Sequence, residues 1–273
     1  MSAKRTGVAA DTYLHRKMCR SVRRHAMIEP GERVAVGISG GKDSLTLLDL
    51  LSRGVGLGPR EANVERSYQL VALHVDGHQA GLPDLRQMVE AHLLTTGLDY
   101  EIVSPSPADL HPGWNEDCLR CARMRRKALF EAAVRQGCTK LALGHHADDV
   151  SATALLNLLY RGTLEGLSPM RPFFGGLMTI IRPLLDCPAE EIASYARRRG
   201  WSFPPELQCP RSGLSHRAHV EAFLRQMGGR SAKQVRTNIA RASTLGDRPS
   251  GQSTGGRDTL GCFEGIDDEG GAL

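Results

Sequence analysis

The sequence lacks any run of apolar residues long enough to cross a membrane. A membrane-spanning helix needs about 18 or more predominantly apolar residues, and no stretch of the 273 residues approaches this length. The N-terminus carries charges but lacks the apolar segment that is typical of a secretion signal. Hydrophobic residues still make up 41% of the chain, which is enough for a folded core. We therefore expect a folded, cytoplasmic protein with no membrane partner.

The sequence also lacks the cysteine pattern of a disulfide-stabilised protein. It has seven cysteines, an odd number, and this count argues against a framework of paired disulfides. Metal binding or thiol chemistry in a reducing compartment is the better interpretation. Only one CxxC pair is present, formed by Cys118 and Cys121.

A strong excess of one charge sign is absent as well. The net charge is +5 with a pI near 8.9, which leaves room for a polyanionic partner without requiring one. The basic residues are nevertheless clustered, and a cluster of this kind is either a solvated helix face or a set of phosphate contacts. There are three such clusters. The first lies in residues 9–27 and contains Arg16, Lys17, Arg20, Arg23 and Arg24. The second contains Arg120, Arg123, Arg125 and Arg126, and the third contains Arg197, Arg198 and Arg199.

The segment 39–44, SGGKDS, follows a strand-like run at 33–38 and precedes an amphipathic run. A strand that turns through two glycines into a helix directs several backbone N–H groups, and the positive end of the helix dipole, at one point. Anions bind well at such a point. The candidate ligands are the backbone of Gly40 and Gly41, the hydroxyls of Ser39 and Ser44, and the side chains of Lys42 and Asp43.

This segment does not match a Walker A loop, which requires a glycine where the chain has Val36 and Ser or Thr where it has Asp43. It resembles instead the PP-loop of the ATP pyrophosphatases, which split ATP between its α and β phosphates. The carboxylate of Asp43 beside a triphosphate is explained by Mg²⁺. The plainer alternative is a glycine-rich turn that only joins a strand to a helix.

Strands and helices alternate along most of the chain. This order predicts parallel strands joined by right-handed crossovers, with helices on both faces of the sheet. We therefore expect a Rossmann-like, doubly wound α/β fold. The expected strands are 33–39, 68–76, 99–104, 139–145 and 179–182, and the expected helices are 9–27, 43–53, 82–97, 119–137, 147–161, one beginning near Pro188, 216–227 and 231–244.

The domain organisation follows from these elements. Residues 1–30 form a basic helical segment, 31–200 the α/β domain, and 201–245 a helical extension that carries Cys209. Residues 246–273 are rich in small and polar residues, which predicts a disordered tail.

The CxxC pair of Cys118 and Cys121 opens a helix that continues into a series of basic residues. Two thiolates at this spacing can bind zinc or an iron–sulfur cluster, or act as a redox dithiol, and the spacing alone does not decide between them. Cys209 is the best candidate for a third ligand. Cys138 and Cys187 lie at the ends of elements and are interpreted as packing residues.

Residues 144–149, GHHADD, follow a strand and open a helix. Because ligands of doubly wound folds bind at the carboxyl edge of the sheet, Asp148 or Asp149 is a candidate partner of Mg²⁺-ATP. The alternative is that the two carboxylates only cap the helix. Neighbouring histidines on a strand point to opposite faces, which disfavours a metal site made of His145 and His146.

These motifs occur together in an order that resembles the tRNA 2-thiocytidine synthetases, the tRNA-cytidine 2-sulfurtransferases that thiolate cytidine 32. The resemblance covers about residues 12–245 and rests on SGGKDS, CLRC, LGHHADD at 143–149, LLNLLYRG at 155–162, IIRPL at 180–184 and the FPPxxxC stretch at 203–209. The chain departs from the family in one respect: the second member of the family's later cysteine pair is Ser212 here.

The resemblance implies a set of cofactors and residue roles. Cys118, Cys121 and Cys209 match the three ligands of a [4Fe-4S] cluster that leaves one iron without a cysteine, and Ser212 is not needed as a ligand. Mg²⁺-ATP is expected at Ser39, Gly40, Gly41, Lys42, Asp43, Ser44, Gly144 and Asp149. The expected catalytic residues are Lys42, Asp43, Asp149 and Arg125, the last matching a basic active-site residue of related thiolases.

The resemblance also implies partners. They are tRNA, a sulfur donor such as a cysteine desulfurase, and a second copy of the chain in a homodimer. Three alternatives stay open: thiolation of a uridine or another tRNA position, a persulfide on the CxxC pair without a cluster, and an RNA-binding protein without turnover. Intact Lys42, Asp43 and Asp149 argue against the last, because a pure binding module has no need of a Mg²⁺-ATP site.

Overall fold

A six-stranded sheet forms the centre of the protein, with the strand order β3-β2-β1-β4-β6-β5. The computed structural model describes residues 7–56, 67–77, 83–105, 118–203, 209, 213, 215–228 and 231–245. The expected tail at 246–273 and most of the FPPxxxC stretch lie outside these residues. The strands are β1 (Arg33–Ile38), β2 (Gln69–Val75), β3 (Asp99–Val103), β4 (Lys140–Ala142), β5 (Met170–Phe173) and β6 (Met178–Ile181).

Five of the six strands were predicted, and the pairs among them are parallel. Strand β5 was not predicted, and it pairs with β6 in the antiparallel direction through a short turn, η4 (Phe174–Gly176). The strand is only four residues long and contains Pro172, which lacks an N–H group for a sheet ladder. The expected all-parallel sheet is therefore corrected to a mostly parallel sheet with one antiparallel edge strand.

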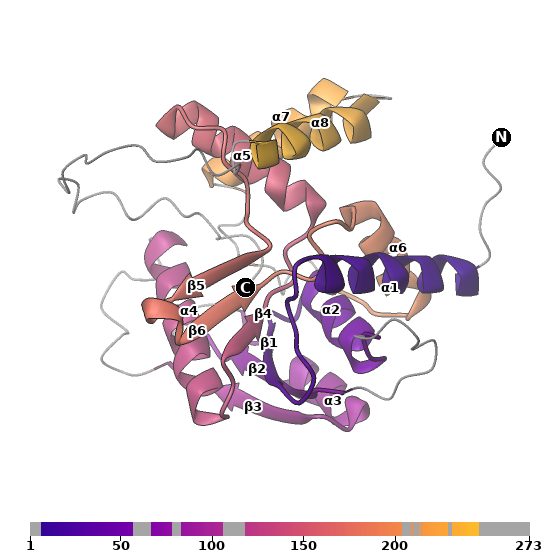
Figure 1. The fold of residues 1–273 in the computed structure, drawn as a ribbon, viewed down its shortest axis with the longest axis vertical. Coiled ribbons are helices and arrows are strands. Elements are labelled where there is room, and N and C mark those ends of the chain that lie inside the picture. The colour runs from indigo at the N-terminus through magenta and orange to yellow at the C-terminus, as the bar shows by residue number, and fades with distance from the viewer. Residues whose placement is uncertain are drawn as a thin grey trace.

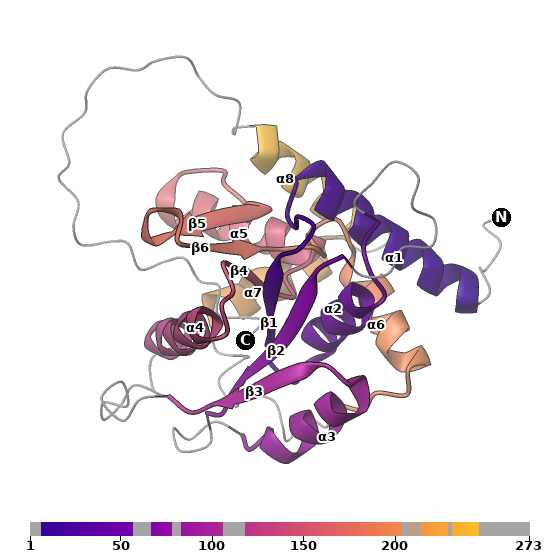
Figure 2. The same ribbon diagram turned by 60° about the horizontal axis from the view of Figure 1, so that its bottom comes forward.

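Alternate residues of β1 face two different apolar cores, which explains why helices cover both faces of the sheet. Val34, Val36 and Ile38 belong to the core beneath α2 (Lys42–Ser52), whereas Ala35 belongs to the core beneath α4 (Cys118–Arg135). Strand residues alternate in this way because successive side chains point to opposite sides of the sheet. Figures 1 and 2 show α4 on one side of the sheet and α2 on the other.

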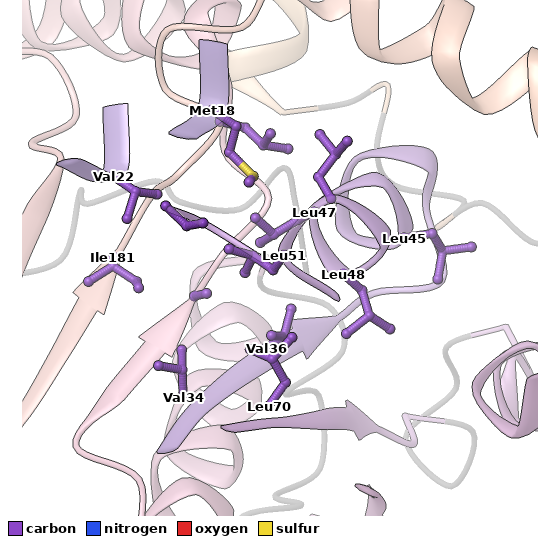
Figure 3. Packing of buried hydrophobic residues seen from close by; sticks show 14 of the residues in the cluster. Met18, Val22, Val34, Val36, Leu45, Leu47, Leu48, Leu51, Leu70 and Ile181 are labelled. Carbon is purple, nitrogen blue, oxygen red and sulfur yellow. The ribbon is translucent and has the colours of Figure 1, made fainter. Parts of the chain in front are cut away.

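The larger core lies on the α2 side. Helix α3 (Arg86–Thr96) also contributes to it, and α1 (Gly7–Arg24) and α6 (Ala189–Arg198) pack outside α2. Figure 3 shows Met18 and Val22 of α1 directed toward Leu47 and Leu51 of α2, above the strand residues. All four side chains are fully buried.

The remaining helices form a separate layer at one end of the sheet (Figure 1). Helix α5 (Ala147–Arg161) follows β4 and contacts both α7 (His216–Gly228) and α8 (Ala232–Leu245). Their shared apolar core is small and consists of Ala152, Leu156, Val220 and Leu224, with half-buried Leu155, Val235 and Ile239 packed against it. Among the described residues, no helix is both long and apolar enough to cross a lipid bilayer.

Candidate functional site

The PP-loop lies between β1 and α2, as expected, and its own hydroxyl groups hold it in shape. The Gly41 N–H donates to Ser39 Oγ (3.2 Å), the Ser39 N–H donates to Ser44 Oγ (3.1 Å), and Ser44 Oγ donates to the Gly41 carbonyl (3.0 Å). The sequence analysis expected both hydroxyls to face a ligand. The structure shows both hydroxyls bonded within the loop, so they fix its shape, and their contact with a ligand stays a prediction.

Glycine is required at position 40 for two reasons. Its φ angle is +81°, which lies in the left-handed region. A Cβ atom there would also approach Val89 Cγ2 to 3.2 Å and Leu85 Cδ1 to 3.3 Å. The turn that directs the first N–H groups of α2 toward one point therefore depends on Gly40.

Asp43 carries an oxygen atom that fits a cation. Its Oδ2 atom pairs with Lys42 Nζ at 2.8 Å. Its Oδ1 atom is buried and has no hydrogen-bond partner among the described residues, with His146 Nε2 at 3.8 Å. A buried carboxylate oxygen without a partner calls for an explanation, and a Mg²⁺ ion, which prefers such ligands, is a suitable one.

The second loop of the site packs directly against the first. A Cβ atom at Gly144 would lie 3.0 Å from both Asp43 C and Ser44 N, so the loop after β4 touches the backbone of the PP-loop. Strands β1 and β4 are neighbours, and the chain continues from β1 to β2 on the opposite side of β1 from β4. The two loops therefore meet at the switch point of the sheet, where doubly wound folds bind ligands.

Asp149 is almost fully buried and is held from two sides. Its Oδ2 atom accepts a hydrogen bond from the His146 N–H at 2.6 Å and lies 3.2 Å from His146 Nδ1. Its Oδ1 atom pairs with Arg217 of α7, whose side chain is also buried. Burial by itself raises the pKa of Asp149, but the neighbouring positive groups, His146 first and Arg217 next, hold that pKa below its usual value.

Asp148 is held in a similar way by a different helix. One oxygen accepts the N–H of Ala189 at 3.2 Å, and the other pairs with Arg236 of α8. Each member of the aspartate pair therefore bonds to backbone near a helix start and to an arginine of the C-terminal extension. The sequence analysis predicted Asp149 and its loop but missed Arg217 and Arg236.

The structure describes the side chains of two of the three predicted cluster ligands, Cys121 and Cys209. Helix α4 begins at Cys118, as predicted, but the side chain of Cys118 lies outside the described part of the chain. Cys121 is buried in the first turns of the helix, and Cys209 is half-buried. Within the described residues, no three His, Cys, Asp or Glu side chains gather as a metal site.

Arg125 lies on α4 and is half-buried. Its positive charge acts on His74, which is buried at the end of β2 and donates from Nδ1 to the carbonyl of Ile38 at 2.7 Å. Burial lowers the pKa of His74, and Arg125 lowers it further. Ile38 directly precedes the PP-loop, so this hydrogen bond holds His74 beside that loop.

The cysteines that were predicted to be packing residues lie in the cores. Cys138 is 3% exposed and Cys187 is 0% exposed. Burial raises the pKa of both thiols, that of Cys187 to about 12. Neither thiol is suited to nucleophilic chemistry at neutral pH.

Several of the arginines that were candidates for phosphate contacts have partners within the protein. Arg198 pairs with Asp11 (2.6 Å), and Arg199 lies 3.3 Å from Asp49. Arg23 donates to the carbonyl of Gly56 at 2.9 Å. Arg198 and Arg199 thereby join α6 to α1 and α2. Arg16, Arg20, Arg120, Arg123 and Arg197 are also exposed to solvent.

The chain is similar in sequence to known proteins. The family model described as a PP-loop domain matches residues 12–205. A tRNA-cytidine(32) 2-sulfurtransferase from Anaeromyxobacter sp. (strain K) is 35% identical over 222 residues, which is 78% of this chain and 74% of the relative. The protein of the same name from Vibrio cholerae is 32% identical over 240 residues, covering 84% of this chain and 75% of the relative.

A solved structure shares the fold. It is the U34-tRNA thiolase NcsA from Methanococcus maripaludis with its [4Fe-4S] cluster. The TM-score is 0.66 at 22% identity, and the match covers 88% of this chain and 79% of the other. At this identity the likeness establishes the arrangement of strands and helices.

Proposed function

The chain belongs to the tRNA-cytidine(32) 2-sulfurtransferase family of PP-loop proteins, and we propose that it converts a cytidine of tRNA, at position 32, to 2-thiocytidine. Its enzyme class, tRNA sulfurtransferase, follows from that membership. The observation that carries the proposal is the contact of the PP-loop with the loop after β4 at the carboxyl edge of the sheet. There, one oxygen of Asp43 is buried and has no hydrogen-bond partner among the described residues.

Mg²⁺-ATP is proposed to bind at this edge. The N–H groups of the first turn of α2 would bind the phosphates, because the first N–H groups of a helix have no acceptor within the helix. Lys42 supplies positive charge, and Asp43 holds the metal ion through Oδ1. Asp149 supports the same site through His146.

The reaction proposed for these residues has two stages. First, the C2 oxygen of the base attacks the α phosphorus of ATP, and pyrophosphate leaves. Sulfide then adds to C2, and AMP departs with the former carbonyl oxygen. Lys42 and the helix N-terminus stabilise the charge that develops on the phosphates in the first stage, and enclosure of the base excludes water from the activated carbon.

Cys118, Cys121 and Cys209 are the proposed ligands of a [4Fe-4S] cluster. Three cysteine thiolates are a suitable donor set for such a cluster, and neither Cys121 nor Cys209 forms a disulfide in the described part of the chain. When bound, the cluster supplies an iron without a protein ligand that can present sulfide to C2. Arg125 is proposed to place positive charge beside the incoming sulfide.

The proposed partners are tRNA, a sulfur donor such as a cysteine desulfurase, and a second copy of the chain. The exposed arginines of α1, α4 and α6 would contact the phosphate backbone, which positions an RNA without reading its bases. An anticodon-loop base is unpaired, so it leaves its stack at modest cost.

The central experiment supplies ATP, Mg²⁺, sulfide and unmodified tRNA to the anaerobically reconstituted full-length protein. The tRNA is then digested, and its nucleosides are identified by mass spectrometry. We expect 2-thiocytidine. Thiouridine without thiocytidine would refute the choice of base, and the absence of any thiolated nucleoside with an intact cluster would refute the proposed reaction.

Two further measurements separate the nucleotide site from the sulfur site. Lys42→Ala should abolish formation of AMP and pyrophosphate while iron content stays near that of the wild type. Alanine at Cys118, Cys121 or Cys209 should abolish iron binding, whereas buried Cys138→Ala should not. Release of ADP, or stoichiometric zinc in place of iron, would contradict the respective assignment.

A further inference from the structure

Arg217 and Arg236 connect the C-terminal extension to the two aspartates of the proposed nucleotide site. Arg217, on α7, pairs with Asp149, and Arg236, on α8, pairs with Asp148. The first pair is buried on both sides, with Arg217 2% and Asp149 6% exposed. Arg217 Nε also donates to Glu221 Oε1 at 3.0 Å, which fixes the guanidinium from a second direction.

A continuous series of polar contacts leads from Arg217 to the PP-loop. Arg217 holds one oxygen of Asp149, and the other oxygen accepts the N–H of His146 at 2.6 Å. That oxygen also lies 3.2 Å from His146 Nδ1, and His146 Nε2 lies 3.8 Å from Asp43 Oδ1. Through His146 and Asp149, the carboxylate that faces the proposed metal ion is thus linked to a residue 174 positions further along the chain, from 43 to 217.

Docking of α7 does not by itself require this ion pair. Val220 and Leu224 already attach the helix to α5 through Ala152 and Leu156. Burying two charges costs desolvation free energy that their attraction does not reliably return, so a buried ion pair is weak evidence for a stabilising role. A role in fixing the direction of a carboxylate explains the pair better, since ligating groups are commonly oriented by partners outside the ligand shell.

We propose that Arg217 and Arg236 are positioning residues of the nucleotide site, so that the C-terminal extension forms part of that site. Arg217 acts through Asp149 and His146 on Asp43, and Arg236 acts through Asp148 at the start of α5. The inference rests on the proposed binding of Mg²⁺-ATP at the PP-loop. Because linkage is reciprocal, bound nucleotide strengthens the docking of α7 and α8 by the same factor by which their docking strengthens nucleotide binding.

The test measures the affinity of the full-length protein for Mg²⁺-ATP by titration, without tRNA or turnover. Arg217→Gln should weaken binding by about tenfold or more, the usual range for loss of a partner that orients a ligand. Arg217→Lys keeps the charge but loses the planar fork, and it should recover part of the affinity. Melting temperatures are recorded for every variant.

Two controls separate positioning from docking. Leu224→Ala weakens the same helix–helix contact through its apolar side, so it should lower the melting temperature while affinity stays within about twofold of the wild type. Arg225→Gln removes an exposed arginine of α7 that pairs only loosely with Glu221, at 4.0 Å, and it should change neither quantity. Equal losses of affinity in Arg217→Gln and Leu224→Ala at equal melting temperature would overturn the inference.

A second pair of measurements keeps the inference testable where Arg217→Gln does not fold. Arg236 is partly exposed, so Arg236→Gln should fold and should weaken Mg²⁺-ATP binding several-fold. In the wild type, Mg²⁺-ATP should slow hydrogen exchange in α7 and α8. Unchanged affinity in Arg236→Gln together with unchanged exchange would overturn this inference alone, whereas no saturable binding by the wild type would overturn the proposed function on which it rests.

Discussion

The helices at the two ends of the chain are attached to the α/β domain by different means. Helix α1 is held by apolar burial: Leu14, Met18 and Val22 are at most 1% exposed and join the main core. Helices α7 and α8 share only a small apolar cluster with α5, and their charged side chains reach the aspartates of the site.

This difference between the two attachments separates residues that affect stability alone from residues that affect both stability and the proposed nucleotide site. The polar contacts of α1, such as Lys17 with Glu191, lie at the rim of an apolar interface and away from the PP-loop. Those of the C-terminal helices end on Asp148 and Asp149. A substitution at the N-terminal attachment should therefore change stability alone, and one at the C-terminal attachment should change both stability and the site.

The largest effect is expected from Asp149→Asn. It removes the buried carboxylate charge that pairs with the Arg217 guanidinium, and the loss of one partner of a buried pair costs about 3–5 kcal/mol in similar cases. Urea unfolding measures the loss. Glu221→Gln is the matched control, because Glu221 also contacts Arg217 but is 39% exposed, and it should cost no more than about 1 kcal/mol. Equal stability of Asp149→Asn and the wild type would show that loss of the Asp149 charge leaves no uncompensated charge on Arg217.

A slightly smaller effect is expected from Met18→Ala at the other attachment. Truncation of a fully buried methionine removes about 2–5 kcal/mol from the free energy of unfolding. Affinity for Mg²⁺-ATP should stay within about twofold, because Met18 packs in the apolar core and its truncation changes stability alone. A large fall in affinity for a folded Met18→Ala protein would contradict the claim that the attachment of α1 affects stability alone.

An intermediate effect is expected from Gly144→Ala, which acts between the two loops. The added methyl group meets the backbone of Asp43 and Ser44 at 3.0 Å, so the loops must separate, at a cost of about 1–3 kcal/mol. Nucleotide titration should show several-fold weaker binding. Gly213→Ala is the control, because a Cβ atom there meets nothing within 4 Å. Identical affinities in the two variants would contradict the close contact of the loops.

The smallest effect is expected from Lys17→Ala. Its ion pair with Glu191 spans 3.3 Å between partly exposed side chains of α1 and α6, and such pairs contribute about 0–1 kcal/mol. The difference from the wild type should shrink further at high salt, where surface charges are screened. Urea unfolding at two ionic strengths tests this, and a loss comparable to that of Met18→Ala would mean that charge, not apolar burial, attaches α1.

Much of the fold could be predicted because local pattern and final structure agree. The apolar run at 33–38 and the paired glycines that follow produce β1 and the start of α2 close to the expected residues. Strand β4 is shorter than predicted, since the chain leaves the sheet to bring Gly144 against the PP-loop. Strand β5 was missed because it has four residues, one of them Pro172, and depends on pairing with β6.

The candidate site was predicted only as far as its residues lie in sequence motifs. Ser39, Lys42 and their neighbours are recognisable because a loop motif places them together. Arg217 lies 68 positions from Asp149, and Arg236 lies 88 positions from Asp148. The sequence does not distinguish an arginine that pairs with a distant aspartate from one that is exposed to solvent on a basic helix. These two contacts could therefore be identified only from the structure.

The proline of β5 has a consequence for how copies of the protein can associate. Strand β5 ends the sheet on one side, and an edge strand offers unpaired N–H and C=O groups to any passing strand. Pro172 removes one of these donors. The strand has four residues, so it offers few backbone groups with which a strand of another molecule could pair. The β5 edge therefore disfavours the addition of a further strand, so two copies of this protein should not associate by joining their sheets at β5.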